Sequence, residues 1–159
     1  MLNGNLDRLA SVVGSWQEHL AVVMDGHKSL KVYQLAYKLA MEIFEISKDF
    51  PREERYSLTD QIRRSSRSVP TNIAEGYRKR QYPNAFANKM SDADGEATET
   101  QVWLDVAKDC HYLNAETYAR LVAGYAQVGN MLGPHDLQSY QVQTKAKLAN
   151  CYCQPPTSQ

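Results

Sequence analysis

Residues 56–77 read YSLTDQIRRSSRSVPTNIAEGY, and this stretch decides the fold. Its apolar and small residues recur at steps of three and four, which is the period of one buried helix face. These residues are Leu58, Ile62, Ser66, Val69, Ile73 and Tyr77. Ser57 and Asp60 form a near-capping box, so the helix should start at Ser57 and reach about Arg80. Pro70 removes one backbone hydrogen bond, and we expect a kink there but no break.

Three further windows have the same period. Together, the four predicted helices cover residues 30–48, 57–80, 84–112 and 115–132. Their boundaries are Phe50-Pro51, the N-caps Asn84 and Asn114, and Gly133-Pro134. The other inward residues include Leu39, Ile43, Phe86, Met90, Ala93, Ala97, Gln101, Leu104, Ala107, Leu121, Tyr125, Val128 and Leu132. We also expect Cys110 in the core, and Gly95 where two helices approach closely.

Short connections place successive helices antiparallel. The predicted fold is therefore all-α: an antiparallel up-down-up-down four-helix bundle, with its second helix kinked at Pro70. The bundle should span residues 28–134. We expect residues 1–27 to form a leader that is either an extra helix or disordered. Translation could also begin at Met24, downstream of most of this leader. Residues 135–159 read as a weakly helical to disordered tail.

Bulk composition excludes several classes of protein. Eighteen Lys and Arg balance eighteen Asp and Glu, so any nucleic-acid binding must come from local charge. The three cysteines, Cys110, Cys151 and Cys153, are an odd number and do not resemble the paired framework of a secreted protein. The N-terminal stretch is neither an export signal nor a membrane span. These features predict a cytoplasmic protein with no membrane partner.

No catalytic or metal-binding constellation is evident in the sequence. A di-metal bundle site needs Glu-x-x-His pairs, and none occurs. Asp92, Glu96 and Glu99 have helical spacing, but a solvated or intersubunit acidic stripe is the better interpretation. The four histidines are scattered, and no phosphate-binding glycine loop is present. We therefore expect no enzyme activity, no cofactor, no metal and no catalytic residues.

Charge is divided between two neighbouring helices. Residues 57–80 carry six basic and two acidic side chains, a net of +4, whereas residues 84–109 carry two basic and six acidic side chains, a net of −4. The candidate nucleic-acid-binding residues are Arg63, Arg64, Arg67, Arg78, Lys79 and Arg80, with Tyr77 and Tyr82 nearby for stacking. The candidate subunit-interface residues are Asn72, Glu75, Asp92, Glu96 and Glu99. A basic face meeting the acidic face of a next copy would close a ring, although both faces could simply be solvated.

The motif of residues 50–77 resembles the signature of one bacterial family, the 23S rRNA intervening-sequence or S23 four-helix-bundle proteins. Its diagnostic parts are Phe50-Pro51, residues 56–65 and residues 68–77. The resemblance implies a ring-like homopentamer related to the accessory proteins of diversity-generating retroelements, which bind reverse transcriptase and nucleic acid. Two positions depart from the family pattern: Arg67 stands where the family more often has an apolar residue, and Glu96 where it more often has a serine.

The motif itself is first of all a specification of the fold. Ile73 and Ala74 should fill the seam, and Asn72 should hydrogen-bond backbone groups freed by Pro70. Alternatively, Asn72 and Glu75 face a neighbouring subunit.

The sequence as a whole predicts a non-catalytic homo-oligomeric scaffold that binds RNA or a nucleic-acid-processing partner through a basic helix face. The alternatives are a purely protein-binding adaptor and, less favoured, a metal-dependent enzyme.

Overall fold

The computed structural model describes residues 26–133, and within this range all regular secondary structure is helical. Its four long helices are α2 (Lys31–Ile46), α3 (Leu58–Arg78), α4 (Pro83–Asp109) and α5 (Ala115–Leu132). Short 3₁₀ helices span Gly26–Ser29, Ser47–Asp49 and Arg52–Tyr56. Most of the predicted leader lies outside the described residues, which include only its last two positions. The predicted tail and Met24, the hypothetical start, also lie outside them.

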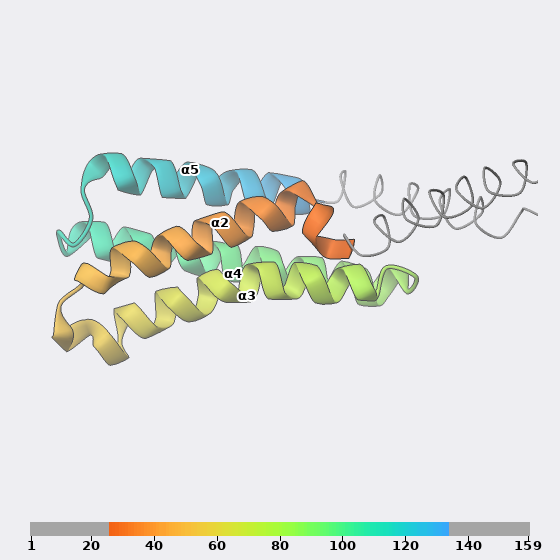
Figure 1. Ribbon diagram of the computed structural model, residues 1–159, viewed down its shortest axis with the longest axis horizontal. Coiled ribbons are helices and arrows are strands. Elements are labelled where there is room, and N and C mark those ends of the chain that lie inside the picture. Colours follow the sequence, from red (N-terminus) through yellow and green to blue (C-terminus); the bar gives the residue numbers. More distant parts are fainter. Residues whose placement is uncertain (1–25, 134–159) are drawn as a thin grey trace, which may run out of the picture.

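Consecutive helices run in opposite directions, which the order of colours in Figure 1 makes visible. Side-chain pairs give the same result for α3 and α4, because Ser65 bonds Thr100 while the later Asn72 bonds the earlier Lys89. Each helix packs against the next along the chain, and α5 returns to α2. The all-α antiparallel four-helix bundle is therefore confirmed, and α3 continues without a break through Pro70.

The start of α3 differs from the predicted capping box. The Ser57 side chain makes no bond to the helix backbone and instead donates its hydroxyl hydrogen to the Glu54 carboxylate. Glu54 Oε2 also accepts from the Leu58 N–H at 3.4 Å, and these bonds, led by the one from Ser57, lower the pKa of Glu54. A carboxylate is the stronger acceptor and its charge suits a helix N-terminus. Asp60 lies in the first turn of α3 as predicted, but Glu54 is the carboxylate that bonds the start of the helix.

Other helix ends follow the local chemistry closely. The predicted N-cap Asn114 is confirmed, since its Oδ1 accepts from the Thr117 N–H at 2.8 Å. Asn84 is not an N-cap, because α4 already begins at Pro83, whose fixed φ suits the first position of a helix. The predictions that the second and third helices reach residues 80 and 112 are slightly long, since α3 ends at Arg78 and α4 at Asp109.

The core is one continuous cluster formed from all four helices. Ile62, Val69 and Ile73 of α3 have no exposed surface, and most of the predicted inward residues are buried with them. On α4 the prediction of Gln101 is wrong by one position, because the neighbouring Thr100 is fully buried in its place. Thr100 can be buried since its hydroxyl lies 2.9 Å from that of Ser65 and 2.8 Å from the carbonyl oxygen of Glu96.

Two glycines mark the closest contacts between helices. A Cβ at Gly76 would lie 2.2 Å from Met90 Cε and 3.2 Å from Lys89 Cβ, and one at Gly124 would lie 2.7 Å from Leu39 Cδ2. A side chain at either position would therefore force Met90 or Leu39 to move. The prediction for Gly95 is wrong, because nothing lies within 4 Å of the Cβ position there. Gly76, the one glycine of the diagnostic motif, thus has a packing role between α3 and α4.

One buried hydroxyl in the core has no hydrogen-bond partner among the described residues. Tyr125 is completely buried, and its Oη makes no hydrogen bond. Burial is the main reason why the pKa of Tyr125 is raised far above its ordinary value, with Glu42 adding a smaller effect. The phenol therefore stays neutral and acts as a large core side chain.

The prediction for Cys110 is wrong, since this residue lies exposed just after α4. The chain turns there, and the next residue, His111, has a positive φ of 62°. Between residues 26 and 133, no three His, Cys, Asp or Glu side chains gather as a set able to hold a metal ion. None of the helices in the same range combines the length and apolar character needed to cross a membrane.

Candidate nucleic-acid interface

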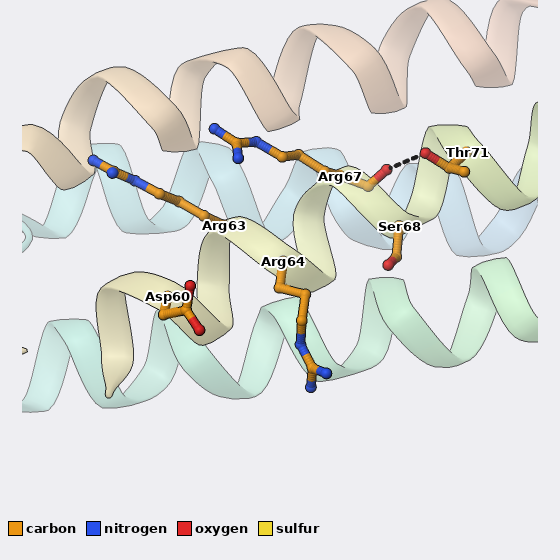
Figure 2. Close-up of a pocket in the computed structure, with 6 residues that line it drawn as sticks. All are labelled: Asp60, Arg63, Arg64, Arg67, Ser68 and Thr71. Carbon is orange, nitrogen blue, oxygen red and sulfur yellow. Dashed lines mark hydrogen bonds between the residues drawn. The ribbon is translucent and has the colours of Figure 1, made fainter. Parts of the chain in front are cut away.

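An open depression lies on the outer face of α3, with a volume of about 490 Å³. Figure 2 shows the side chains that line it, which come from about three successive turns of this one helix. They are Asp60, Arg63, Arg64, Arg67, Ser68 and Thr71. Three of the six predicted nucleic-acid-binding residues therefore lie together, and we call Arg63, Arg64 and Arg67 the α3 arginine cluster.

Arg63 and Arg67 lean toward α2 (Figure 2). Their guanidinium carbons lie 5.0 and 5.4 Å from the centre of the Phe44 ring, within the range of a cation–π contact. Arg63 Nε also donates to the Ser47 hydroxyl at 2.6 Å. These contacts hold the long side chains in place without neutralising their charge, so part of the entropy cost of binding an anion is already met.

Arg64 points the other way, toward α4 (Figure 2). It donates to Gln61 Oε1 at 3.0 Å. Its charge lowers the pKa of Glu96 on α4, but burial, the largest effect, and the nearby Glu99 outweigh it, so the pKa of Glu96 is raised overall. The basic and acidic stripes of α3 and α4 consequently meet along one edge of the bundle.

The charge of the α3 arginine cluster is not cancelled by ion pairs. In the part of the chain that the structure describes, no Asp or Glu oxygen lies within 4.0 Å of these guanidinium groups. Arginine presents several N–H donors in a planar fork that matches a phosphate oxygen pair. The depression is thus chemically suited to a phosphate-bearing ligand.

The other three predicted basic residues, Arg78, Lys79 and Arg80, lie elsewhere. Arg78 is the last residue of α3, about 17 Å along the helix from Arg67. Arg80 folds back onto Tyr77, with its guanidinium 4.2 Å from the ring centre and a 2.7 Å hydrogen bond to the Tyr77 carbonyl oxygen. The six basic residues therefore form two groups and not one patch.

Sequence reasoning missed a row of large side chains on α2 beside the α3 arginine cluster. Tyr33 and Tyr37 stack with ring centres 6.0 Å apart, and Tyr37 and Met41 are 52% and 42% exposed. Phe44 continues the row and carries Arg63 and Arg67. We call Tyr33, Tyr37, Met41 and Phe44 the α2 row. Their spacing of four, four and three residues was the available signal, hidden because the same helix also has a strong buried face.

The predicted interface residues Asn72 and Glu75 both contact Lys89 of the same chain. Lys89 Nζ donates to Asn72 Oδ1 at 3.1 Å and lies 2.9 Å from Glu75 Oε2. The hydrogen bond between Glu75 and Lys89 is the main cause of both pKa shifts, lowering that of Glu75 and raising that of Lys89. The hydrogen-bond partner of the Asn72 side chain is thus a lysine on α4 and not the backbone near Pro70, which corrects that prediction.

The acidic interface candidates line the α4 side of the same edge. Asp92 lies 3.5 Å from Lys89, and Glu99 accepts from Trp103 Nε1 at 3.1 Å. Glu96 stands between them with a raised pKa. Their assignment to a subunit contact stays a prediction.

Glu96→Gln is expected to stabilise the fold slightly at neutral pH. Because the folded-state pKa of Glu96 is raised, its ionised form opposes folding, and the wild type loses stability as pH rises through that pKa. We expect the melting temperature at pH 7 to rise by about 2 °C, and the difference to vanish near pH 4, where the glutamate is protonated. Thermal unfolding followed by circular dichroism measures both, with the exposed Glu53→Gln as control. A lower melting temperature at pH 7 would show that attraction to Arg64 dominates.

Comparison with known proteins shows which family has this fold and sequence. The model of the family described as 23S rRNA-intervening sequence protein matches residues 28–134. A similar solved structure is a protein of unknown function from the S23 ribosomal protein family of Bacteroides thetaiotaomicron. It shares 27% identity at a TM-score of 0.59, and the match covers 64% of this chain and 90% of that one. No curated protein matches the sequence.

Proposed function

Because the chain belongs to the 23S rRNA-intervening sequence protein family, we propose that it is a non-catalytic, cytoplasmic, homo-oligomeric scaffold that binds RNA or a nucleoprotein through α3. The observation that carries this proposal is the α3 arginine cluster, which lines an open depression. Asp60 lines the same depression, but among the described residues no carboxylate oxygen lies within 4.0 Å of the three guanidinium groups. Burying three arginine charges without ion-pair partners would cost folding free energy. The three guanidinium groups must therefore face solvent or a bound anion.

Assembly would multiply this local charge. The protomer is neutral overall, with 18 basic and 18 acidic side chains, and one arginine cluster gives only a modest field. In the pentamer that the family resemblance implies, five copies of the cluster would act on one polyanion. A ring thus gives a neutral protein a way to hold RNA.

Features of α4 support contact between copies of the chain. Val102 and Val106 are exposed, and they lie one turn apart on the same helix face. The acidic stripe of Asp92, Glu96 and Glu99 runs along the same helix. Apolar exposure beside one sign of charge favours a partner surface that is apolar and basic. In this proposal α4 lies in the contact between copies, and the α2 row and the α3 arginine cluster stay open to RNA.

The experiment is the absolute mass in solution by light scattering, with and without a pool of structured RNA, at low and moderate salt. We expect a mass five times that of the protomer, which shifts upward with RNA, and binding that falls steeply as salt rises. A monomer indifferent to RNA at low salt would overturn the proposal.

An assembled protein that ignores RNA would instead favour the protein-binding adaptor. The apolar side chains on the surface, Met41, Val102 and Val106, give that alternative its support. Recovery of one specific partner on immobilised full-length protein, lost when Val102→Ser and Val106→Ser are introduced, would establish it.

A further inference from the structure

We infer that the α2–α3 surface takes an unpaired nucleic-acid strand, with bases stacked on the α2 row and phosphates held by Arg63 and Arg67. This inference rests on the proposed function and specifies the form of nucleic acid that the surface binds. Stacking platforms next to arginines are the arrangement by which proteins hold single strands, since every base has a flat face to offer.

The first step is the geometry of the α2 row. The Tyr33 and Tyr37 rings are nearly parallel, at 21°. At the outer end, His27 packs edge to face against Tyr33, with ring centres 4.8 Å apart and an angle of 77° between the rings. One end of the stack is therefore occupied by the protein itself. Tyr37, at the other end, is 52% exposed, and the next residue of the row, Met41, is 42% exposed. The open side of the stack thus leads along α2 toward Phe44.

The second step is the register of the two helices. Arg63 and Arg67 both lie over Phe44, which shows that the α2 row faces the edge of α3 where these arginines stand. Helix periodicity puts Arg78 on the same side of α3 as Arg67, since eleven residues are about three turns. Positive charge on α3 therefore stands at two places beside the row, which are about 17 Å apart.

The third step is the match in size. From Tyr33 to Phe44 the row is about 17 Å long, which is enough to lie along a strand of a few nucleotides. Bases of a duplex are paired and turned inward, so their faces are out of reach of a tyrosine on a convex helix surface. The phosphate contacts alone would serve duplex and single strand alike, and the exposed ring of Tyr37 is what favours the unpaired form.

Core packing explains only some of the large side chains in the α2 row. Phe44 is half-buried and packs under two arginines, so its place is explained by the fold. Tyr37 and Met41 gain little from burial, and a charged or small residue would serve the fold equally well at such positions.

The test measures binding of a fluorescent oligouridylate and of a blunt RNA duplex of equal length to the full chain by fluorescence anisotropy. Tyr37→Ala is expected to weaken oligouridylate binding by about 5-fold or more, from the lost stacking, and to leave duplex binding unchanged. Tyr37→Phe keeps the ring and should bind as the wild type does. The matched control is Tyr56→Ala, which removes a tyrosine that is 85% exposed but lies off the row. Light scattering and circular dichroism confirm that assembly and helix content are kept.

The outcomes separate this inference from the proposed function. Equal loss of single-strand and duplex binding, or no loss in Tyr37→Ala while the protein still binds RNA, overturns the inference and leaves the proposed function standing. Absence of binding to either probe at low salt defeats both. Selective loss in Tyr37→Ala, with Tyr37→Phe and Tyr56→Ala unchanged, supports the unpaired strand.

Discussion

The triple change Arg63→Glu, Arg64→Glu and Arg67→Glu is expected to abolish RNA binding or assembly while leaving helical content nearly intact. Each protomer loses three positive charges and gains three negative ones on one face, where the described structure offers no carboxylate to be displaced. Phosphates that the cluster attracts in the wild type would then be repelled.

The salt dependence of RNA binding shows how many phosphate contacts the arginine cluster makes. If the three arginines contact phosphates, neutralising them with glutamine should reduce the slope of log K against log salt by about 2 to 3 units. The glutamine variants also control for packing, because they remove the positive charge without placing a negative charge beside Phe44 or Ser47. Anisotropy over a salt series measures the slope, and light scattering reports the mass of each variant.

A control with the same change of charge is available on another face. Lys28, Lys31 and Lys38 are exposed, and Lys31 and Lys38 lie away from the α2 row by helix periodicity. Reversal of these three to glutamate changes the net charge equally and should weaken RNA binding far less. If the arginine variant keeps both its mass and its affinity, the nucleic-acid and the electrostatic-assembly hypotheses both fail.

Ile73→Ala is expected to lower the free energy of unfolding by about 3 to 4 kcal/mol, within the usual range for a buried isoleucine. Ile73 has no exposed surface and lies in the single core cluster, three residues before the close contact at Gly76. The cost combines lost burial with a cavity that four packed helices cannot close. It is a large part of the roughly 5 to 15 kcal/mol that stabilises a domain of this kind.

A graded series makes this prediction specific. Ile73→Val should cost about 1 kcal/mol, and Thr71→Ala, an exposed neighbour on α3, should cost less than either. Urea unfolding followed by circular dichroism gives the three values at one protein concentration. A cost below 1 kcal/mol for Ile73→Ala would mean that the diagnostic motif serves a surface and not the core.

Much of the fold was predictable because it depends on local periodicity. The spacing of Leu58, Ile62, Val69 and Ile73 defines one face of α3 whatever lies against it, and the N-cap Asn114 acts within a single turn. The errors arose where two local signals competed. Glu54 displaced the predicted capping pair, and Thr100 replaced Gln101 because the choice between adjacent positions depends on where α3 lies.

The candidate site was predictable only in part. Charge along the sequence identified Arg63, Arg64 and Arg67, which are close in space because they are close on one helix. It also grouped them with Arg80, which instead folds onto Tyr77. The α2 row was missed, since nothing in the sequence says which neighbour an exposed aromatic face has.

The sequence by itself therefore determined the four helices, their order, their buried faces and the charge that each one carries. All of these follow from interactions within a few residues along the chain, whose energies do not require a partner helix. Only the tertiary structure decided that Arg63 and Arg67 lie over Phe44, that Gly76 and Gly124 allow close contacts, and that Cys110 is exposed. These depend on how far each helix is rotated and shifted against its neighbours, and packing of the whole core sets that geometry at once.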